Sequence, residues 1–453
     1  MEKHELRAAA SLAGVFSVRL LGLFMIYPVF ASYALHLRGA SAYRTGLALG
    51  IYGLTQGLLQ IPFGLLSDRV GRKVMIVIGL VVFGVGSALA AASTSIEGVI
   101  IGRAVQGGGA IGSVILALVA DLTSEESRTK AMALVGITIG TSFMVALVSG
   151  PLLAGIIGVQ GIFWLMTLLA LVGIGIVLFV VPRPLRQQIR GDAETVPAML
   201  GSILRNPELL RLDFGIFSLH AMLTAAFLAV PALLHARLSV SSSSQWMVYL
   251  PILLVSALVM VPTVIIAERY RRMKAVFLAT IAALAASQWM LAFAGAYVSV
   301  VLAALTLFFS AFNVMEATLP SLITKTSPAR AKGTATGVYS SSQFLGIFVG
   351  GVAGGWLQQR TGDTAIFLWA GALALLWLLL AAGMRQPSYL VTRLLRVGRT
   401  ADVQQLSAAL ARLPGVAEVV VVADEQLAYL KVDSKVFDGA RAQSLADAGA
   451  DGP

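Results

Sequence analysis

The chain contains no cysteine, and only 12 % of its 453 residues are charged. The absence of cysteine excludes disulfides, thiolate metal sites and a cysteine nucleophile. A soluble domain carries about 25 % charged residues, so this chain has too few charges to cover the surface of a soluble protein of its length. The composition excludes a soluble enzyme, a disordered chain and a nucleic-acid-binding protein, although the sequence pI is about 10.1.

Histidine is also scarce, with 4 residues in the whole chain. The sequence contains no nucleotide-binding glycine loop, no cluster of metal ligands and no plausible catalytic triad. We therefore expect no enzyme activity, no cofactor and no metal site. The chain is instead hydrophobic, because apolar residues make up 58 % of it and the mean hydropathy is +0.86.

Long apolar segments account for this hydrophobicity. A bilayer core about 30 Å thick needs about 20 mostly apolar residues in a helix. Twelve such spans are predicted, at 12–36, 45–66, 75–95, 98–120, 131–155, 161–181, 212–236, 245–267, 275–296, 298–324, 332–357 and 364–384. The first span lacks a small-residue cleavage site, so we interpret it as a retained helix and not as a signal peptide.

The spans divide the chain into four predicted domains. Two six-helix bundles, at 1–181 and 212–387, flank a polar cytoplasmic linker at 182–211, and a tail follows at 388–453. Placing the N-terminus inside puts 19 Lys and Arg residues in the inner loops and the linker and only 4 in the outer loops. Positive charge collects on the cytoplasmic side of bacterial-type inner membranes, so both termini are predicted to be cytoplasmic.

The tail has the composition of a small soluble domain. A strand is expected within 389–397, a helix over 401–413, and a hairpin of two strands at 416–423 and 427–432. A last short helix could begin at Ser434 or Asp438. This order of elements predicts a small α+β, ferredoxin-like domain.

The two bundles repeat each other at an offset of about 200 residues. Asp68-Arg69 and Arg72 reappear as Glu268-Arg269 and Arg272, and further matches at offsets of 202 and 203 include Arg128/Arg330 and Phe24/Phe227. An even number of spans separates the copies, so both lie in the same orientation. Parallel halves with a substrate site between them are one architecture of secondary transporters, whereas a channel needs no such pairing.

The loop after the second span reads G-L-L-S-D-R-V-G-R-K from Gly64 to Lys73. It resembles, at every defined position, the G-x-L-x-D-R-x-G-R-K signature of the major facilitator superfamily, whose fold has twelve helices. The resemblance implies a conformational latch in which Asp68 lies against the N-terminus of the eleventh helix and interacts with Arg72 and Asp121. The latch residues are Gly64, Asp68, Arg69, Gly71, Arg72, Lys73 and Asp121. A loop that only carries positive charge is the alternative.

Three charges lie inside spans, where a charge is costly and indicates function by default. Arg103 lies in G-R-A-V-Q-G, which resembles the second signature of the family. The resemblance implies that Arg103 tunes proton transfer. The alternative is that its side chain snorkels to the membrane surface. Arg19 lies about two turns into the first span and is also expected to take part in proton coupling. Glu316 is the only carboxylate predicted deep within a span, and we expect it to be the proton site, with a neutral, helix-fastening role as the alternative.

Two further segments resemble motifs of proton antiporters. Gly150, Pro151 and Gly155 match part of the G-P-x-x-G-G core of the antiporter signature, although Ala154 replaces a glycine, and packing alone could also explain them. The first span, with Tyr27-Pro28-Val29, resembles the first-helix motif of twelve-span drug:proton antiporters but lacks its second proline and its early acidic residue.

A drug-like site is an apolar cavity with a few polar groups. Candidates occur on the first, second, seventh, eighth and eleventh spans, whose helices line the cavity in the family, and Asn313 on the tenth span is a further candidate. The candidates are Tyr27, Tyr33, Gln56, Gln60, His220, Trp246, Asn313 and Gln343. The whole chain, including its tail, resembles major facilitators that carry a ferredoxin-like C-terminal extension.

These observations predict a proton-coupled secondary transporter that exports a small amphipathic or drug-like solute by alternating access. A metabolite or sugar exporter or facilitator of the same fold is the first alternative, and a membrane sensor that binds ligand without transport is the second. The expected partners are the solute, protons and the lipid bilayer, with no nucleic acid. A monomer is expected, and contacts made by the tail remain open.

Overall fold

The computed structural model describes residues 3–182, 197–295, 297–328, 331–386, 390–397, 403–422, 426–433 and 436–448. Its chain forms two compact units. The first comprises residues 1–188, 211–319 and 337–384, and the second comprises residues 189–210, 320–336 and 385–453. Each unit is described by itself below.

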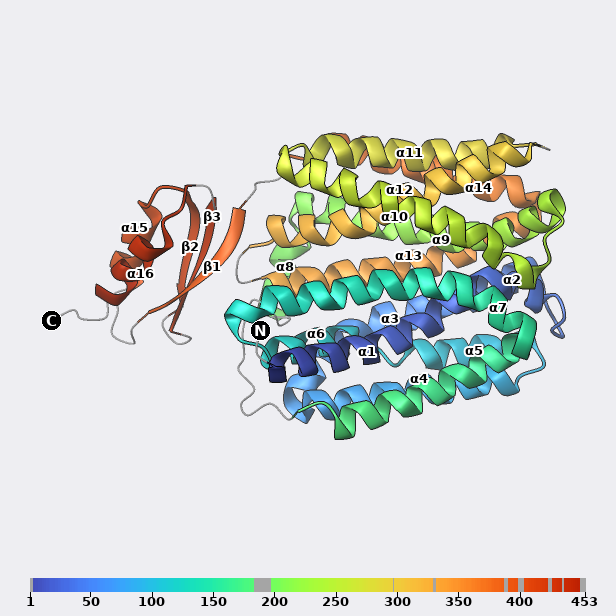
Figure 1. Ribbon diagram of the computed structural model, residues 1–453, viewed down its shortest axis with the longest axis horizontal. Coiled ribbons are helices and arrows are strands. Elements are labelled where there is room, and N and C mark those ends of the chain that lie inside the picture. Colours follow the sequence, from blue (N-terminus) through green and yellow to red (C-terminus); the bar gives the residue numbers. More distant parts are fainter. Residues whose placement is uncertain are drawn as a thin grey trace. The chain divides into compact units, whose positions relative to one another are not determined.

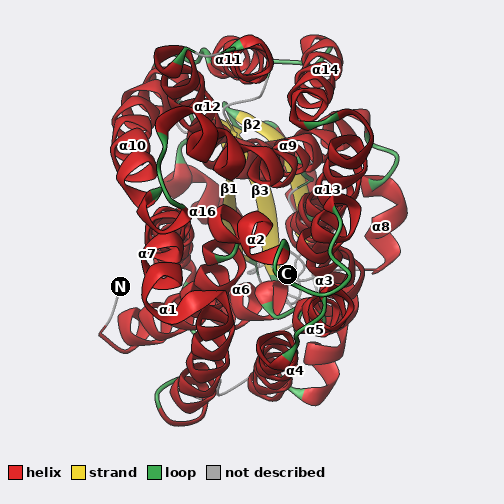
Figure 2. Cartoon of the chain, turned by 90° about the vertical axis from the view of Figure 1, so that its right-hand side faces the viewer, coloured by secondary structure: helices red, strands yellow, loops and turns green. Residues whose placement is uncertain are grey.

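The first unit consists of helices in two groups, α1–α7 and α9–α14 (Figures 1 and 2). The first group contains α1 Lys3–Met25, α2 Tyr27–Ala34, α3 Ala42–Val70, α4 Arg72–Ala92, α5 Ile96–Gly107, α6 Gly112–Asp121 and α7 Glu125–Phe179. The second contains α9 Pro207–Leu238, η1 Ser242–Ser244, α10 Trp246–Arg269, α11 Met273–Phe293, α12 Val298–Thr326, α13 Lys332–Thr361 and α14 Asp363–Ala382. The short helix α8 Pro197–Ile203 precedes α9.

These helices account for twelve membrane crossings. Within the described residues, 10 stretches are long and apolar enough to span a membrane. One of them, Lys130–Phe179, has 50 residues and turns back at Gly158, whose φ is +69°, so it contains two crossings (Figure 1). The helix α13 has 30 residues and is less apolar because it lies between the two groups. The predicted twelve-helix class of fold is therefore confirmed.

Two predicted spans are interrupted in the structure. The first is divided at Ile26, because Pro28 cannot donate a backbone hydrogen bond within a continuous helix. The fourth is divided between Gly107 and Gly112, within a run of glycines that favours non-helical backbone. Both stretches still cross the membrane once, at His4–Ala34 and Ile96–Asp121, because hydropathy measures apolar length and not helix continuity.

The backbone confirms the internal repeat. Left-handed residues occur at matching positions of the two groups, because Gly39 pairs with Ser239 and Gly71 with Arg271 at the same offset of 200 residues. Gly158 and Gly362, which have φ values of +69° and +88°, precede the last helix of each group. Since these turns connect equivalent helices, the two groups are parallel copies of one six-helix design.

The C-terminal domain has the predicted α+β architecture. Its strands β1 Leu390–Arg396, β2 Val416–Val422 and β3 Leu427–Asp433 form an antiparallel sheet in the order β1-β3-β2. The helices α15 Val403–Ala411 and α16 Gly439–Ala448 lie on one face of this sheet (Figure 1). Leu430 and Val432 of β3 pack against Leu406 and Leu410 of α15 in one small core.

The opposite face of this sheet is also buried, at Tyr429 and Lys431. Lys431 Nζ donates hydrogen bonds to the backbone carbonyls of Lys325, at 3.1 Å, and of Ser327, at the end of α12. Burial lowers the pKa of Lys431, and the Glu418 carboxylate partly opposes that shift. The lysine thereby satisfies carbonyl groups that a helix end leaves without partners.

Candidate functional site

The loop at 64–73 is held in shape by an arginine between two carboxylates. Arg72 Nη1 lies 2.8 Å from Asp68 Oδ1, and its Nε donates a 2.5 Å hydrogen bond to Asp121 Oδ2. Arg72 Nη1 also donates to Ser67 Oγ at 3.2 Å. Gly71 precedes the arginine with a φ of +106°, a conformation that residues with a Cβ rarely adopt. The sharp turn thus aims Arg72 back at Asp68 and across at Asp121.

The other loop residues have separate environments. Lys73 Nζ donates a 2.7 Å hydrogen bond to the carbonyl oxygen of Val181, whereas Arg69 is exposed. A Cβ on Gly64 would lie 3.3 Å from Ser113 Oγ, so the glycine permits close contact between α3 and α6. The implied contact of Asp68 with the N-terminus of the eleventh helix stays a prediction.

Replacing Asp121 by asparagine is expected to destabilise the protein by about 3–5 kcal/mol, because it leaves the buried Arg72 without one of its carboxylates. The two side chains are 3 % and 6 % exposed. The matched control is Glu97→Gln in the Arg44–Glu97 pair, which has a similar distance of 2.6 Å but exposed side chains and should lose at most about 1 kcal/mol. Denaturant titration in detergent micelles measures both; equal losses would contradict the prediction.

Two buried arginines dominate the polar interior of the first helix group. Arg19 Nη2 donates to Tyr52 Oη at 3.0 Å and to Gln56 Oε1, and Gln56 Nε2 donates to Gln60 Oε1 at 2.8 Å. Arg103 lies over the Tyr52 ring, 4.8 Å from its centroid, so Tyr52 touches both guanidinium groups. The sequence analysis did not identify Tyr52 as a site residue.

Arg103 is held within its own helix and by its neighbours. Its Nη1 donates a 2.6 Å hydrogen bond to Gln106 Oε1, whose Nε2 donates to Ser87 Oγ at 2.8 Å. Its Nε donates to the carbonyl oxygen of Ala48 at 3.4 Å. Arg103 is completely buried, and the snorkelling alternative is therefore wrong in this structure.

The polar interior of the second helix group is built around His220. Its Nδ1 lies 3.3 Å from the carbonyl oxygen of Ile216 and must donate to it, which leaves Nε2 as an acceptor. Gln343 Nε2 donates to this Nε2 at 2.8 Å, and Glu316 Oε1 lies 3.6 Å from the same atom. Three helices, α9, α12 and α13, therefore bring an acid next to a neutral base.

Asn313 does not join this cluster, although it is near Glu316 in the sequence. Its Nδ2 donates a 2.7 Å hydrogen bond to Ser256 Oγ of α10, so it fastens α12 to α10.

Asp213 is a second buried carboxylate that the sequence analysis missed. It is 5 % exposed, and neither of its oxygens has a hydrogen-bond partner among the described residues. α9 begins at Pro207 and Asp213 lies in its second turn, so this carboxylate is buried near a helix end, whereas Glu316 is deep within α12. Helix boundaries are the least certain part of a hydropathy profile.

The two helix groups carry opposite charges in their interiors. The interior of the first group contains Arg19 and Arg103, and that of the second contains Glu316 and, two residues after Arg211 in the second turn of α9, Asp213. A count of acids and bases by half of the chain could have found this asymmetry. Within the described residues, no group of three or more potential ligands lies close enough to hold a metal ion.

The two groups meet on the membrane face opposite to the 64–73 loop, which we call the far face. Gly46 of α3 faces Gly351 and Gly355 of α13 so closely that a Cβ on Gly46 would lie 2.1 Å from the Gly351 carbonyl oxygen. In Figure 2, α3 and α13 lie side by side. Ser242 Oγ donates to Ser32 Oγ at 3.2 Å on the same face. The structure is therefore closed on the far face.

Tyr27 and the predicted antiporter helix make further contacts near the far face, both between the groups and within the first group. Tyr27 Oη lies 3.3 Å from Thr224 Oγ1. A Cβ on Gly150 would lie 2.3 Å from the Met25 carbonyl oxygen, and one on Gly155 would lie 2.8 Å from Ser243 Cβ. Pro151 lies within α7. These residues pack the far-face half of α7 against α1 and the turn before α10.

Two of the candidate cavity residues lie apart from both polar clusters. Tyr33 is next to the last residue of α2, and Trp246 is the first residue of α10, so both are at far-face helix ends.

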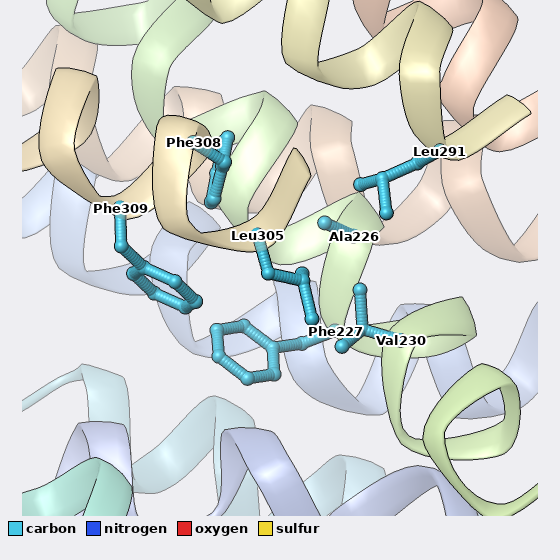
Figure 3. Close-up of a pocket in the computed structure, with 7 residues that line it drawn as sticks. All are labelled: Ala226, Phe227, Val230, Leu291, Leu305, Phe308 and Phe309. Atoms are coloured by element: carbon cyan, nitrogen blue, oxygen red, sulfur yellow. The ribbon is translucent and has the colours of Figure 1, made fainter. Parts of the chain in front are cut away.

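One enclosed apolar pocket lies within the second group (Figure 3). Its volume is about 10 Å³, and it is lined by Ala226, Phe227, Val230, Leu291, Leu305, Phe308 and Phe309. Since one water needs about this much space, the pocket is a packing defect and not a solute site.

Comparisons with known proteins agree with this architecture. The family profile described as Major Facilitator Superfamily matches residues 12–260 and 212–410, and the profile described as YajR YAM domain matches residues 393–442. The inner membrane transport protein YajR of Escherichia coli is 43 % identical over 439 residues, which cover 96 % of each chain.

More distant relatives share parts of the chain or its fold. Multidrug resistance protein 2 of Bacillus subtilis is 32 % identical over 34 % of this chain and 39 % of its own length. A solved structure of the nucleoside transporter NupG has a TM-score of 0.68 at 12 % identity and covers 83 % of this chain and 99 % of that one. The latter similarity shows the fold alone.

Proposed function

The chain belongs to the major facilitator superfamily and is a multi-pass inner-membrane transporter, and we propose that it is a proton-coupled antiporter that exports a small amphipathic or drug-like solute by alternating access. The observation that carries the proposal is the cluster of Glu316, His220 and Gln343, in which His220 is buried and the Glu316 side chain is 29 % exposed. The partial similarity to a protein named for multidrug resistance supports the substrate class.

The cluster has the chemistry of a proton site. A proton on Glu316 lies near a neutral imidazole nitrogen 3.6 Å away, and it can pass to that nitrogen when the hydrogen bond from Gln343 is released. A charged carboxylate inside the membrane is costly, so loss of the proton favours a rearrangement that brings the group to water. Arg103 and Arg19, on the opposite helix group, oppose the binding of positive charge near their own side.

A second carboxylate extends this site toward the loop face. Asp213 lies seven residues before His220 in α9, so it is on nearly the same helix face and roughly 10 Å closer to the loop face. Tyr339 lies four residues before Gln343 in α13 and interacts electrostatically with both Glu316 and Asp213. We propose that protons move in the order Glu316, Tyr339, Asp213 from the centre to the loop face when the helix groups rearrange.

The orientation of this route follows from the charge of the loops. We place the loop face in the cytoplasm with both termini, because Lys and Arg collect on that side. We also propose that the transporter functions as a monomer and that its partners are the solute and protons. The latch residues Asp68, Arg72 and Asp121 lie at the cytoplasmic ends of α3, α4 and α6 in this orientation.

Proteoliposomes loaded with a pH-sensitive dye test the proposal. Naphthalene-based solutes that are cationic, neutral or anionic are added outside, and we expect at least one to enter in exchange for protons, which raises the internal pH. Solute entry without a pH change would contradict antiport and favour a facilitator. Ligand-induced thermal stabilisation without any solute entry would contradict transport and favour a sensor.

Asp213→Asn is expected to slow proton exchange about tenfold or more while leaving solute affinity unchanged, because it removes the proton acceptor between Tyr339 and the cytoplasm. The matched control is Asp363→Asn, which removes a carboxylate of the same helix group at a far-face helix end. The rate of pH change in the dye-loaded vesicles measures both. An Asp213→Asn protein with the wild-type rate would contradict the proposed route.

A further inference from the structure

Arg19 lies in the middle of the membrane with neutral partners only. It is the 16th residue of the 31-residue span His4–Ala34 and is 2 % exposed. Its two hydrogen bonds go to Tyr52 Oη and Gln56 Oε1, and its Nε has no partner among the described residues. A guanidinium group has five N–H donors, so the site has hydrogen-bonding capacity that the protein does not use.

Among the residues that the structure describes, no acidic side chain bonds to this arginine. The hydrogen bonds of Arg19 go to Tyr52 and Gln56 and those of Arg103 to Gln106 and the Ala48 carbonyl, all of which are uncharged groups. The acidic residues Glu5, Asp68, Glu97 and Asp121 lie in the end turns of their helices. A buried charge without an opposite charge is strongly unfavourable. An anion bound here would therefore form the ion pair and the hydrogen bonds that the protein does not provide for Arg19.

The geometry points to Arg19 as the anion-binding residue of the central site, and to a transported solute that carries a carboxylate, sulfonate or phosphate group. This inference rests on the proposed transport from a site between the two helix groups. Arginine presents two parallel donors that match such anions. Gln56, Gln60 and Tyr52 supply neutral polar groups that can orient the anion.

Arg19 suits this role better than Arg103 because of its surroundings. Arg103 donates hydrogen bonds to Gln106 and Ala48 and is covered by the Tyr52 ring. Tyr52 in turn contacts Phe344 of α13, with ring centroids 6.4 Å apart. The Arg19–Tyr52 pair therefore adjoins the seam between the helix groups, where alternating access opens and closes a path for solute.

The depth of Arg19 favours a solute over a lipid headgroup. With 15 residues on either side within the span, the guanidinium is roughly 20 Å from each membrane surface. A headgroup would have to leave the surface by that distance, whereas a solute in the central site is already at this level.

A matched series of probes tests the inference on the unmodified full-length protein. Naphthalene-2-sulfonate, 2-naphthol and 2-naphthylmethylammonium share one apolar body and differ in charge. We expect the sulfonate to raise the melting temperature in detergent at concentrations at least about tenfold lower than the other two. Equal effects of the three, or a preference for the ammonium probe, would overturn the inference. Repeating the series in lipid nanodiscs with added phosphatidylglycerol tests the lipid source, and competition by the lipid would overturn the solute assignment.

Variants locate the binding site. Arg19→Gln should weaken sulfonate binding at least about tenfold, Arg19→Lys should retain part of it, and the outer-loop control Arg38→Gln should bind like the wild type. Unchanged affinity in a folded Arg19→Gln protein would overturn the inference. We expect Glu316→Gln to bind the sulfonate like the wild type. Anion binding at Arg19 and proton coupling at Glu316 are thus tested separately, because either hypothesis can fail while the other holds.

Discussion

Glu316→Gln is expected to abolish proton movement by reconstituted protein while leaving the exchange of solute for solute. Glutamine keeps the size and polarity of the side chain but cannot bind and release a proton. The hydrogen bond between Gln343 and His220, at 2.8 Å, does not involve Glu316 and stays in place. The measurement compares, in the same vesicles, the internal pH change on solute addition with the exchange of labelled for unlabelled solute.

Two further variants make this result specific. Glu316→Asp retains a carboxyl group and should retain coupling at a lower rate, because its carboxyl lies farther from His220. Glu97→Gln removes an exposed carboxylate at the far face and should behave like the wild type. If Glu316→Gln vesicles still move protons with solute at the normal ratio, Glu316 is not the proton site. Loss of both exchange and proton movement would show that the side chain is needed for folding or solute binding.

Gly46→Ala is expected to reduce transport to less than roughly one-tenth of the wild-type rate, because the protein could no longer close on the far face. The new Cβ would lie 2.1 Å from the Gly351 carbonyl oxygen and 2.9 Å from Gly355 Cα, whereas carbon contacts need about 3.5 Å or more. Both obstacles are backbone atoms, so α3 and α13 would have to separate. The equilibrium between the two access states then shifts toward the state that is open on the far face.

The natural absence of cysteine allows a direct measurement of this shift. Thr224 is fully buried beneath the far-face contacts, so a Thr224→Cys thiol should react slowly with a maleimide in detergent and at least about tenfold faster when Gly46→Ala is added. Gly175→Ala is the matched control, because a Cβ at Gly175 would meet nothing within 4 Å. Normal transport by Gly46→Ala would show that the contact is not required.

The opposite interior charges of the two helix groups connect these expectations. The first group carries Arg19 and Arg103, which keep their charge in every state, and the second carries Asp213 and Glu316, which can be neutralised by protons. A fixed positive side and a titratable negative side suit a transporter that exchanges protons for a solute, since proton loss and solute binding both change the charge of the same seam. The two helix groups also move relative to each other in alternating access. The seam between them is therefore where proton binding and solute binding are coupled.

Much of the architecture follows from the sequence because it depends on local patterns. Apolar length predicts a crossing wherever about 20 residues avoid charge, and the offset of 200 residues predicts parallel halves that Gly71 and Arg271 confirm by their backbone conformation. The turn at Pro414-Gly415 and the alternation along 427–432 similarly predict the tail, because strand and helix periodicity are read within a few residues.

The sequence by itself thus determined the membrane class, the twelve crossings and the small α+β tail. Only the tertiary structure decided which polar residues meet: His220, Glu316 and Gln343 come from three helices, and Arg19 finds Tyr52 on another. It also revealed the burial of Asp213 and the contact between Gly46 and Gly351. These contacts are determined by helix packing. In a membrane, helix packing depends on small residues and on polar pairs far apart in the chain, and hydropathy and motif spacing do not show which of these residues pair.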